Sequence, residues 1–234
     1  MQIFYAPGIS GDTYVLDENE SKHCIRVLRM TKGTPVRLID GKGTLYEGFI
    51  DDPDSKRCMI SISENKAEYE KRDYRLHIAI SPLKNPERFE WFIEKIVEIG
   101  VDEITPVICK NTEKQSVKQE RINNIIISAM KQSVKAYKTV FNDPLFYSDF
   151  ISKPYKGIKI IAHCGSLTDR KKISEVYKKN ENVVIIIGPE GDFSEKEILS
   201  AVSNNFIPVQ LGSSRLRTET AGVAACHSIY FINQ

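Results

Sequence analysis

Three absences narrow what this 234-residue sequence can be. Basic and acidic side chains nearly balance, at 33 and 31, so no overall excess of positive charge marks a nucleic-acid binder. No apolar run approaches the roughly 18–20 residues of a membrane-spanning helix. The first ten residues lack the basic start and long apolar core of a secretory signal. We therefore expect a cytoplasmic protein with no membrane partner.

Cysteine is also sparse, and its placement argues against a metal site. The five cysteines form no CxxC pair, and no HExxH or other Cys/His pairing at metal spacing occurs. Buried, reduced thiols are the better interpretation, with no metal bound. The residues are Cys24, Cys58, Cys109, Cys164 and Cys226.

Two nucleotide-binding motifs are missing as well. No GxGxxG follows an expected strand, and no GxxxxGK[ST] occurs. The run Gly41-Lys42-Gly43 lies in an expected hairpin, which is the wrong context for a phosphate loop. These absences argue against a Rossmann dehydrogenase and a P-loop NTPase.

What is present indicates an α/β protein with two domains. Five short strand-like runs separated by turns, with one short helix after Asp17, predict a small N-terminal β-barrel. The charged stretch 65–73 contains no branched aliphatic residue and is expected to be a linker. Strands and helices then alternate, which predicts a largely parallel sheet. The expected strands are 3–5, 13–15, 36–39, 45–50 and 58–62, then 76–80, 104–108, 159–164, 183–187 and 206–211.

Helix signals are clearest in the second half of the chain. Asn85 is expected to cap a helix that has Pro86 at its first position and ends at Gly100. Further helices are expected from about 121, over 169–178, from Ser194 to about 203, and from about 218. Ser194 and Glu197 have the spacing of a capping box, with Phe193 and Ile198 as a hydrophobic staple. Residues 110–120 are polar and are expected to form an exposed loop.

The stretch 183–225 combines two strand–loop–helix units. A buried strand ends at Gly188-Pro189-Glu190-Gly191, and the strand at 206–211 is followed by a loop that carries Arg215 and Arg217. Both loops leave the carboxyl ends of strands and lead into helices, where ligands of open α/β sheets bind. Free N–H groups at such helix starts favour polar or anionic groups. Ordinary connecting turns remain an equal alternative on this pattern alone.

The residues themselves carry a resemblance. GPEGDFSEKE followed by LGSSRLRTETA closely resembles the C-terminal signature of the SPOUT RNA methyltransferases. It is most similar to the RsmE family, which methylates N3 of a uridine in 16S ribosomal RNA of the small subunit. The likeness extends through His23 to Met30 and through Glu90 to Gly100.

The resemblance implies a PUA-like β-barrel that binds RNA over residues 1–70 and a SPOUT methyltransferase domain over 74–234. That domain would contain a mostly parallel sheet and a deep trefoil knot. It would bind S-adenosyl-L-methionine and form a homodimer. The expected cofactor-binding residues are His163, Gly165, Gly188, Pro189, Glu190, Gly191, Leu211, Gly212, Leu216, Arg217, Thr218, Thr220 and Ala221.

Methylation at N3 requires that nitrogen to lose its proton, and charge then spreads onto the flanking carbonyl oxygens. A fixed cation lowers this barrier, and Arg217 is the first candidate. Glu219 is expected either to orient Arg217, to accept the proton, or only to begin a helix favourably. Arginine in the opening motif of the 110–120 loop would be typical of the family, but this chain has Lys110-Asn111-Thr112-Glu113 there.

Local basic patches are the expected RNA surface. Lys22, Arg26 and Arg29 share one face of an α-helix, and Lys131 and Lys135 line another, each either contacting phosphate or facing solvent. Two rival functions stay open. One is the same fold acting on another RNA, such as transfer RNA. The other is a ribosome-associated RNA-binding protein without catalysis.

Overall fold

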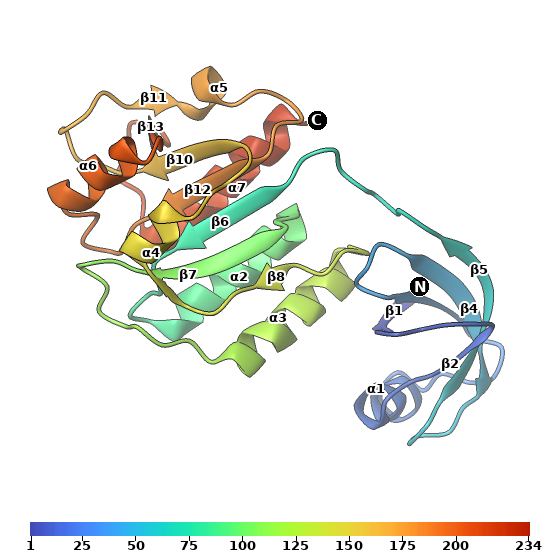
Figure 1. Cartoon of the computed structure of the whole chain (residues 1–234). Helices are drawn as coiled ribbons and strands as arrows, with labels where there is room; N and C mark the ends of the chain where they lie inside the picture. The colour runs from blue at the N-terminus through green and yellow to red at the C-terminus, as the bar shows by residue number, and fades with distance from the viewer. The chain divides into compact units, whose positions relative to one another are not determined.

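A computed structural model describes all 234 residues, which divide into two compact units (Figure 1). The N-terminal unit contains residues 1–71 together with 127–138, and the C-terminal unit contains 72–126 and 139–234. The last part of one helix therefore belongs with the N-terminal strands, which no sequence pattern indicated. The expected linker begins too early, because the fifth strand runs to Lys66 and Asn65 pairs with Tyr46.

The N-terminal unit is built on a curled five-stranded sheet (Figure 1). Its order is β1-β3-β4-β5-β2, with β1 and β3 parallel and the other pairs antiparallel. The path ends at β1 and β2, so the sheet is an open half-barrel. Its inner face buries a core that includes Phe4, Leu38 and Ile60. The strands are β1 (Gln2–Tyr5), β2 (Thr13–Val15), β3 (Pro35–Ile39), β4 (Leu45–Asp52) and β5 (Met59–Lys66).

The helix after Asp17 is shorter and less regular than the sequence suggests. Asp17 does cap α1 (Glu18–Lys22), accepting the Glu20 N–H at 2.8 Å. The return bond expected of Glu20 is absent, because its carboxylate pairs with Lys131. A π-helix, η1 (His23–Val27), follows, and Arg29 has a left-handed φ of 53°. The prediction that Lys22, Arg26 and Arg29 share one α-helical face is therefore wrong.

The C-terminal unit contains a parallel sheet in the order β11-β13-β10-β12-β6-β7-β8. A short strand, β9, pairs with β7 outside this path. Every ladder is parallel, as the alternation of strands and helices predicted. The strands are β6 (Leu76–Ile80), β7 (Glu103–Ile108), β8 (Val140–Phe141), β9 (Leu145–Phe146), β10 (Ile158–Ala162), β11 (Lys171–Lys172), β12 (Val183–Ile187) and β13 (Ile207–Gln210).

The helices of this part of the chain follow most of the sequence signals. Asn85 and Pro86 begin α2, and Gly100 ends it with a φ of 113°. The expected helix over 169–178 is wrong: residues 171–172 form the short strand β11, and only residues 173–176 form a single helical turn, α5. The helix α3 ends before Lys135, since Val134 has a φ of 58°. The bounds are α2 (Pro86–Ile99), α3 (Gln119–Gln132), α4 (Tyr147–Ser152), α5 (Ile173–Val176), α6 (Glu195–Ser203) and α7 (Thr218–Ile232).

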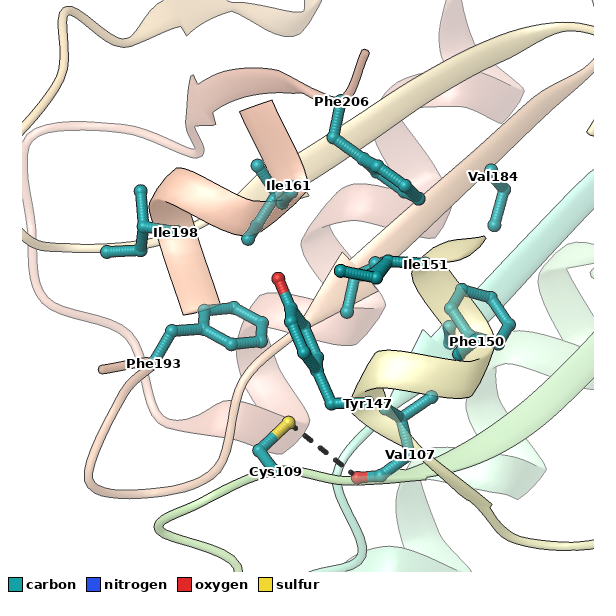
Figure 2. Close-up of a cluster of buried hydrophobic side chains, with 13 residues drawn as sticks. Val107, Cys109, Tyr147, Phe150, Ile151, Ile161, Val184, Phe193, Ile198 and Phe206 are labelled. Carbon is teal, nitrogen blue, oxygen red and sulfur yellow. Dashed lines mark hydrogen bonds between the residues drawn. The ribbon is translucent and has the colours of Figure 1, made fainter. Parts of the chain in front are cut away.

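A hydrophobic cluster fixes α6 against the sheet (Figure 2). Phe193 and Ile198 both lie in this cluster, as the predicted staple requires, and the Phe193 ring packs against that of Tyr147. Ser194 caps α6 with the predicted box, and its N–H and hydroxyl both donate to Glu197. These contacts fix the start of α6, and therefore also the end of the loop that follows β12. No helix is both long and apolar enough to cross a bilayer.

Candidate active site

A cavity of about 750 Å³ opens where three neighbouring strands of the C-terminal sheet end. The strands are β10, β12 and β13, which lie side by side in the sheet. The loops that follow them, the start of α7 and one residue of α2 form the wall. This placement at the carboxyl ends of parallel strands is where the sequence pattern located a ligand site.

Most of the predicted cofactor residues lie around this one cavity. Gly165, Gly191 and Thr220 do not line it, although each is next to a residue that does. Both catalytic candidates, Arg217 and Glu219, also line it. The predicted cofactor residues in the wall are His163, Gly188, Pro189, Glu190, Leu211, Gly212, Leu216, Arg217, Thr218 and Ala221.

The loop after β12 has a conformation that only certain residues permit. A Cβ atom at Gly188 would lie 2.9 Å from the ring of Phe193, so a larger residue would displace the staple. Asp192 has a left-handed φ of 60°, which Asp and Asn tolerate better than most residues. Its carboxylate accepts the N–H of Cys164 and of Phe193, each at 2.8 Å. One side chain therefore joins the loop after β10 to the loop after β12.

Residues 110–113 support the same loop from outside the cavity. The Asn111 amide donates to the backbone oxygens of Gly191 at 3.3 Å and Asp192 at 3.0 Å. Lys110 N–H donates to Glu197 at 2.7 Å. The family resemblance suggested an arginine in the motif 110–113. In this chain Asn111 of that motif instead hydrogen-bonds the backbone of the loop 188–192.

His163 is one of three buried polar residues of the cavity wall, with Thr218 and Glu219, and its imidazole is only partly hydrogen-bonded. Its Nε2 lies 3.1 Å from the Thr168 hydroxyl, and its backbone oxygen accepts Arg170 at 2.8 Å. Its Nδ1 is buried without a hydrogen-bond partner. Burial lowers the pKa of His163, with the negative charge of Asp192 opposing that shift. A neutral imidazole with an unpartnered nitrogen can still take a hydrogen bond from a ligand.

The start of α7 brings opposite charges to the cavity. Arg217 is the N-cap residue and is exposed, and the guanidinium groups of Arg215 and Arg217 have no ion-pair or hydrogen-bond partner. Glu219 is buried in the first turn. Its cationic partner is Arg88 of α2, with Nε and Oε1 3.9 Å apart. The alternative in which Glu219 orients Arg217 has no contact to support it.

Sequence reasoning missed three charged residues of this wall: Arg88, Arg170 and Asp192. Asp192 directly follows the GPEG motif and has the residue type that favours left-handed turns, so its position carried a signal. Arg88 and Arg170 carried none, because only the packing of α2 and the path of the loop after β10 bring them to the cavity.

The basic residues of the N-terminal unit that were predicted to contact RNA differ in whether an acidic side chain already pairs with them. Lys22, Arg26 and Arg29 are exposed, and Arg26 makes only a 3.4 Å contact to the Ser55 hydroxyl. Lys131 and Lys135 instead pair with acids of their own unit, Glu20 and Glu70.

Cys164 is the exposed cysteine, and it lines the cavity, whereas the other four are buried. Burial raises the pKa of Cys24 to about 12, so this thiol stays protonated and unreactive. No group of three or more His, Cys, Asp or Glu side chains is arranged to hold a metal ion.

Comparison with known proteins matches both parts of the chain. Residues 70–230 match the RNA methyltransferase domain, and residues 16–63 match the RNA methyltransferase PUA domain. Ribosomal RNA small subunit methyltransferase E of Buchnera aphidicola (strain APS) is 30% identical over 220 residues. That alignment covers 91% of this chain and 85% of the relative.

Solved structures are similar over the whole chain. A probable rRNA-methyltransferase from Porphyromonas gingivalis has 40% identity and a TM-score of 0.93, covering 100% of this chain and 98% of that one. Ribosomal RNA small subunit methyltransferase E from Neisseria gonorrhoeae, bound to S-adenosyl methionine, has 26% identity and a TM-score of 0.90 with the same coverages. The chain therefore belongs to the RNA methyltransferase family that includes the ribosomal RNA small subunit methyltransferases E.

Proposed function

We propose that this protein transfers a methyl group from S-adenosyl-L-methionine to N3 of a uridine in 16S ribosomal RNA. The observation that carries the proposal is the single cavity at the ends of β10, β12 and β13. It gathers the GPEG loop, the Arg217 loop and His163, which lie far apart in the sequence. Family membership supplies the reaction class, and the names of the relatives supply the substrate.

The residues of the cavity fit the proposed cofactor. A volume of about 750 Å³ falls within the range of small-molecule sites. The unpartnered Nδ1 of His163 would be satisfied by a polar ligand atom. Leu211 and Leu216, apolar wall residues that are partly exposed, can pack against a flat ring. When bound, the cofactor supplies a methyl group on a positively charged sulfur.

Arg217 is proposed to stabilise the negative charge that forms on the uracil. Its guanidinium has no acidic partner in the protein, so it is free to donate hydrogen bonds to the O2 or O4 of the base. Such a donor is strongest in a site from which water is excluded. Glu219, an acceptor-only group while ionised, is proposed to take the proton that N3 loses.

The N-terminal unit is proposed to hold the RNA through the exposed Lys22, Arg26 and Arg29. Lys131 and Lys135 contribute less in this view, because each is already neutralised by an acid. Replacing Arg26 and Arg29 together by Gln should weaken subunit binding and reduce its salt dependence. Unchanged binding at all salt concentrations would remove the N-terminal unit from the proposal.

We further propose that the protein acts in the cytoplasm as a homodimer whose C-terminal domain contains the knot implied by the resemblance. Light scattering at micromolar concentration tests the dimer, and a monomer there would contradict it.

The function is tested with purified protein, methyl-labelled S-adenosyl-L-methionine and small ribosomal subunits that lack the modification. The expected product is 3-methyluridine in 16S RNA, identified by nucleoside analysis. Transfer RNA serves as the competing substrate in a parallel reaction. Label in transfer RNA alone would favour the same fold acting on another RNA. Calorimetry without any heat from the cofactor would favour a non-catalytic RNA-binding protein.

A further inference from the structure

The packing of α2 against α7 places two charged side chains opposite each other in the cavity wall. Gly222 of α7 meets the ring of Phe92 of α2 so closely that a Cβ atom there would lie 2.4 Å from the ring. Arg88 precedes Phe92 by four residues and Glu219 precedes Gly222 by three, about one turn in each helix. The close approach that glycine allows therefore continues toward the cavity, where Arg88 and Glu219 meet.

The environment of Glu219 makes Arg88 its main source of electrostatic support. The Glu219 side chain is 9% exposed and forms no hydrogen bond, and its ion pair with Arg88 spans 3.9 Å. A carboxylate removed from water is costly unless a cation or hydrogen-bond donors compensate it. The first turn of α7 contributes favourably as well, since helix starts favour negative charge.

Arg88 is also free of competing partners. Its side chain is 48% exposed, it lines the cavity, and Glu219 is the acid it contacts. A separation of 3.9 Å is an ion pair without a hydrogen bond, so the lone pairs of Glu219 stay available to a substrate proton.

We propose that Arg88 is a positioning residue for methyl transfer, which holds the Glu219 carboxylate in place at the cavity wall as the proton acceptor. This inference rests on the proposed function and adds a residue that the sequence motifs did not indicate. In the reaction the N3–H bond breaks and its proton passes to a Glu219 oxygen. N3 bonds to the methyl carbon, and the electron pair of the broken carbon–sulfur bond stays on sulfur.

The test compares Arg88→Met with a matched control, Arg121→Met. Arg121 of α3 forms an ion pair at 2.9 Å with Glu90 of α2, the helix that also contains Arg88, but Arg121 lines no part of the cavity. Arg88→Met should lower kcat about tenfold or more, leave KM for small subunits within about twofold, and bind S-adenosyl-L-methionine normally by calorimetry. Arg121→Met should keep wild-type kcat. Arg88→Lys, which retains the positive charge, should recover part of the lost rate.

A double-mutant cycle separates this role from direct RNA contact or loss of structure. Glu219→Gln alone should lower kcat about a hundredfold or more. If Arg88 acts through Glu219, adding Arg88→Met to that variant should change kcat by less than about twofold.

Two results would overturn the inference. One is a full Arg88 effect in the Glu219→Gln background. The other is a rise in KM without a fall in kcat, which is the signature of a phosphate contact. Wild-type protein that leaves unmodified subunits unmethylated would instead contradict the proposed function itself, before any variant is made.

Discussion

The Asp192 carboxylate joins two loops of the cavity, so replacing this residue tests whether those loops are held together before the cofactor binds. Asp192 accepts one N–H from the loop after β10 and one from the start of the α6 staple. Three variants separate its contributions. Asp192→Asn keeps one acceptor oxygen and still tolerates the left-handed φ of 60°. Asp192→Gly tolerates this φ but has no acceptor oxygen. Asp192→Ala has no acceptor oxygen and does not tolerate this φ.

The expected losses follow from these contacts. Each hydrogen bond contributes about 1 kcal/mol to the free energy of unfolding, and alanine in a left-handed conformation costs roughly 1 kcal/mol more. Asn should therefore lower the free energy of unfolding by about 1 kcal/mol, Gly by about 2 and Ala by about 3. Urea denaturation measures these differences. In the Gly and Ala variants the two loops are less ordered before the cofactor binds. Ordering them on binding costs free energy, so cofactor affinity should fall about tenfold or more.

Equal free energies of unfolding for the Gly and Ala variants would show that the left-handed conformation at residue 192 does not affect stability. Wild-type cofactor affinity in Asp192→Ala, measured by calorimetry, would refute the view that this carboxylate organises the cavity.

Four further outcomes are expected. Arg217→Ala should lower turnover at least about a hundredfold with cofactor binding nearly intact, measured by labelled methyl transfer and calorimetry. Gly222→Ala should lower the free energy of unfolding by about 1–3 kcal/mol in urea, because its methyl group would overlap the Phe92 ring. Cys164 should react first with a thiol reagent in the native protein, and the cofactor should slow that reaction. Burial lowers the pKa of His77 to about 4 in the folded protein, whereas the unfolded chain has the ordinary value of 6.5. Between these two pH values the unfolded chain binds more protons than the folded protein. Stability in urea should therefore fall from about pH 6.5 to 4, and less steeply in His77→Gln.

Local chemistry made much of the C-terminal unit predictable. The buried run Val183–Ile187, the box of Ser194 with Glu197, and the end of α2 at Gly100 each depend on neighbouring residues only. The two loop motifs are close enough to family patterns to predict a shared site, and most of their predicted residues line one cavity. Patterns of this kind specify strands, caps and motifs with little reference to the rest of the chain.

Other features depend on contacts between distant segments, which no local pattern reveals. The association of residues 127–138 with the N-terminal strands is one example, and the ion pairs that occupy Lys131 and Lys135 follow from it. The π-helix that turns Arg29 away from an α-helical face is another. Arg88 lies in the cavity wall through the packing of α2 against α7, which is close at Gly222.

The central claim is that one cavity at the ends of β10, β12 and β13 brings a methyl donor to N3 of a ribosomal uridine. The most direct measurement is nucleoside mass spectrometry of 16S RNA after unmodified small subunits are incubated with the purified protein and labelled S-adenosyl-L-methionine. The account predicts labelled 3-methyluridine from the wild type and almost none from Arg217→Ala. Absence of label on any uridine with the wild type, or equal label with both proteins, would contradict it.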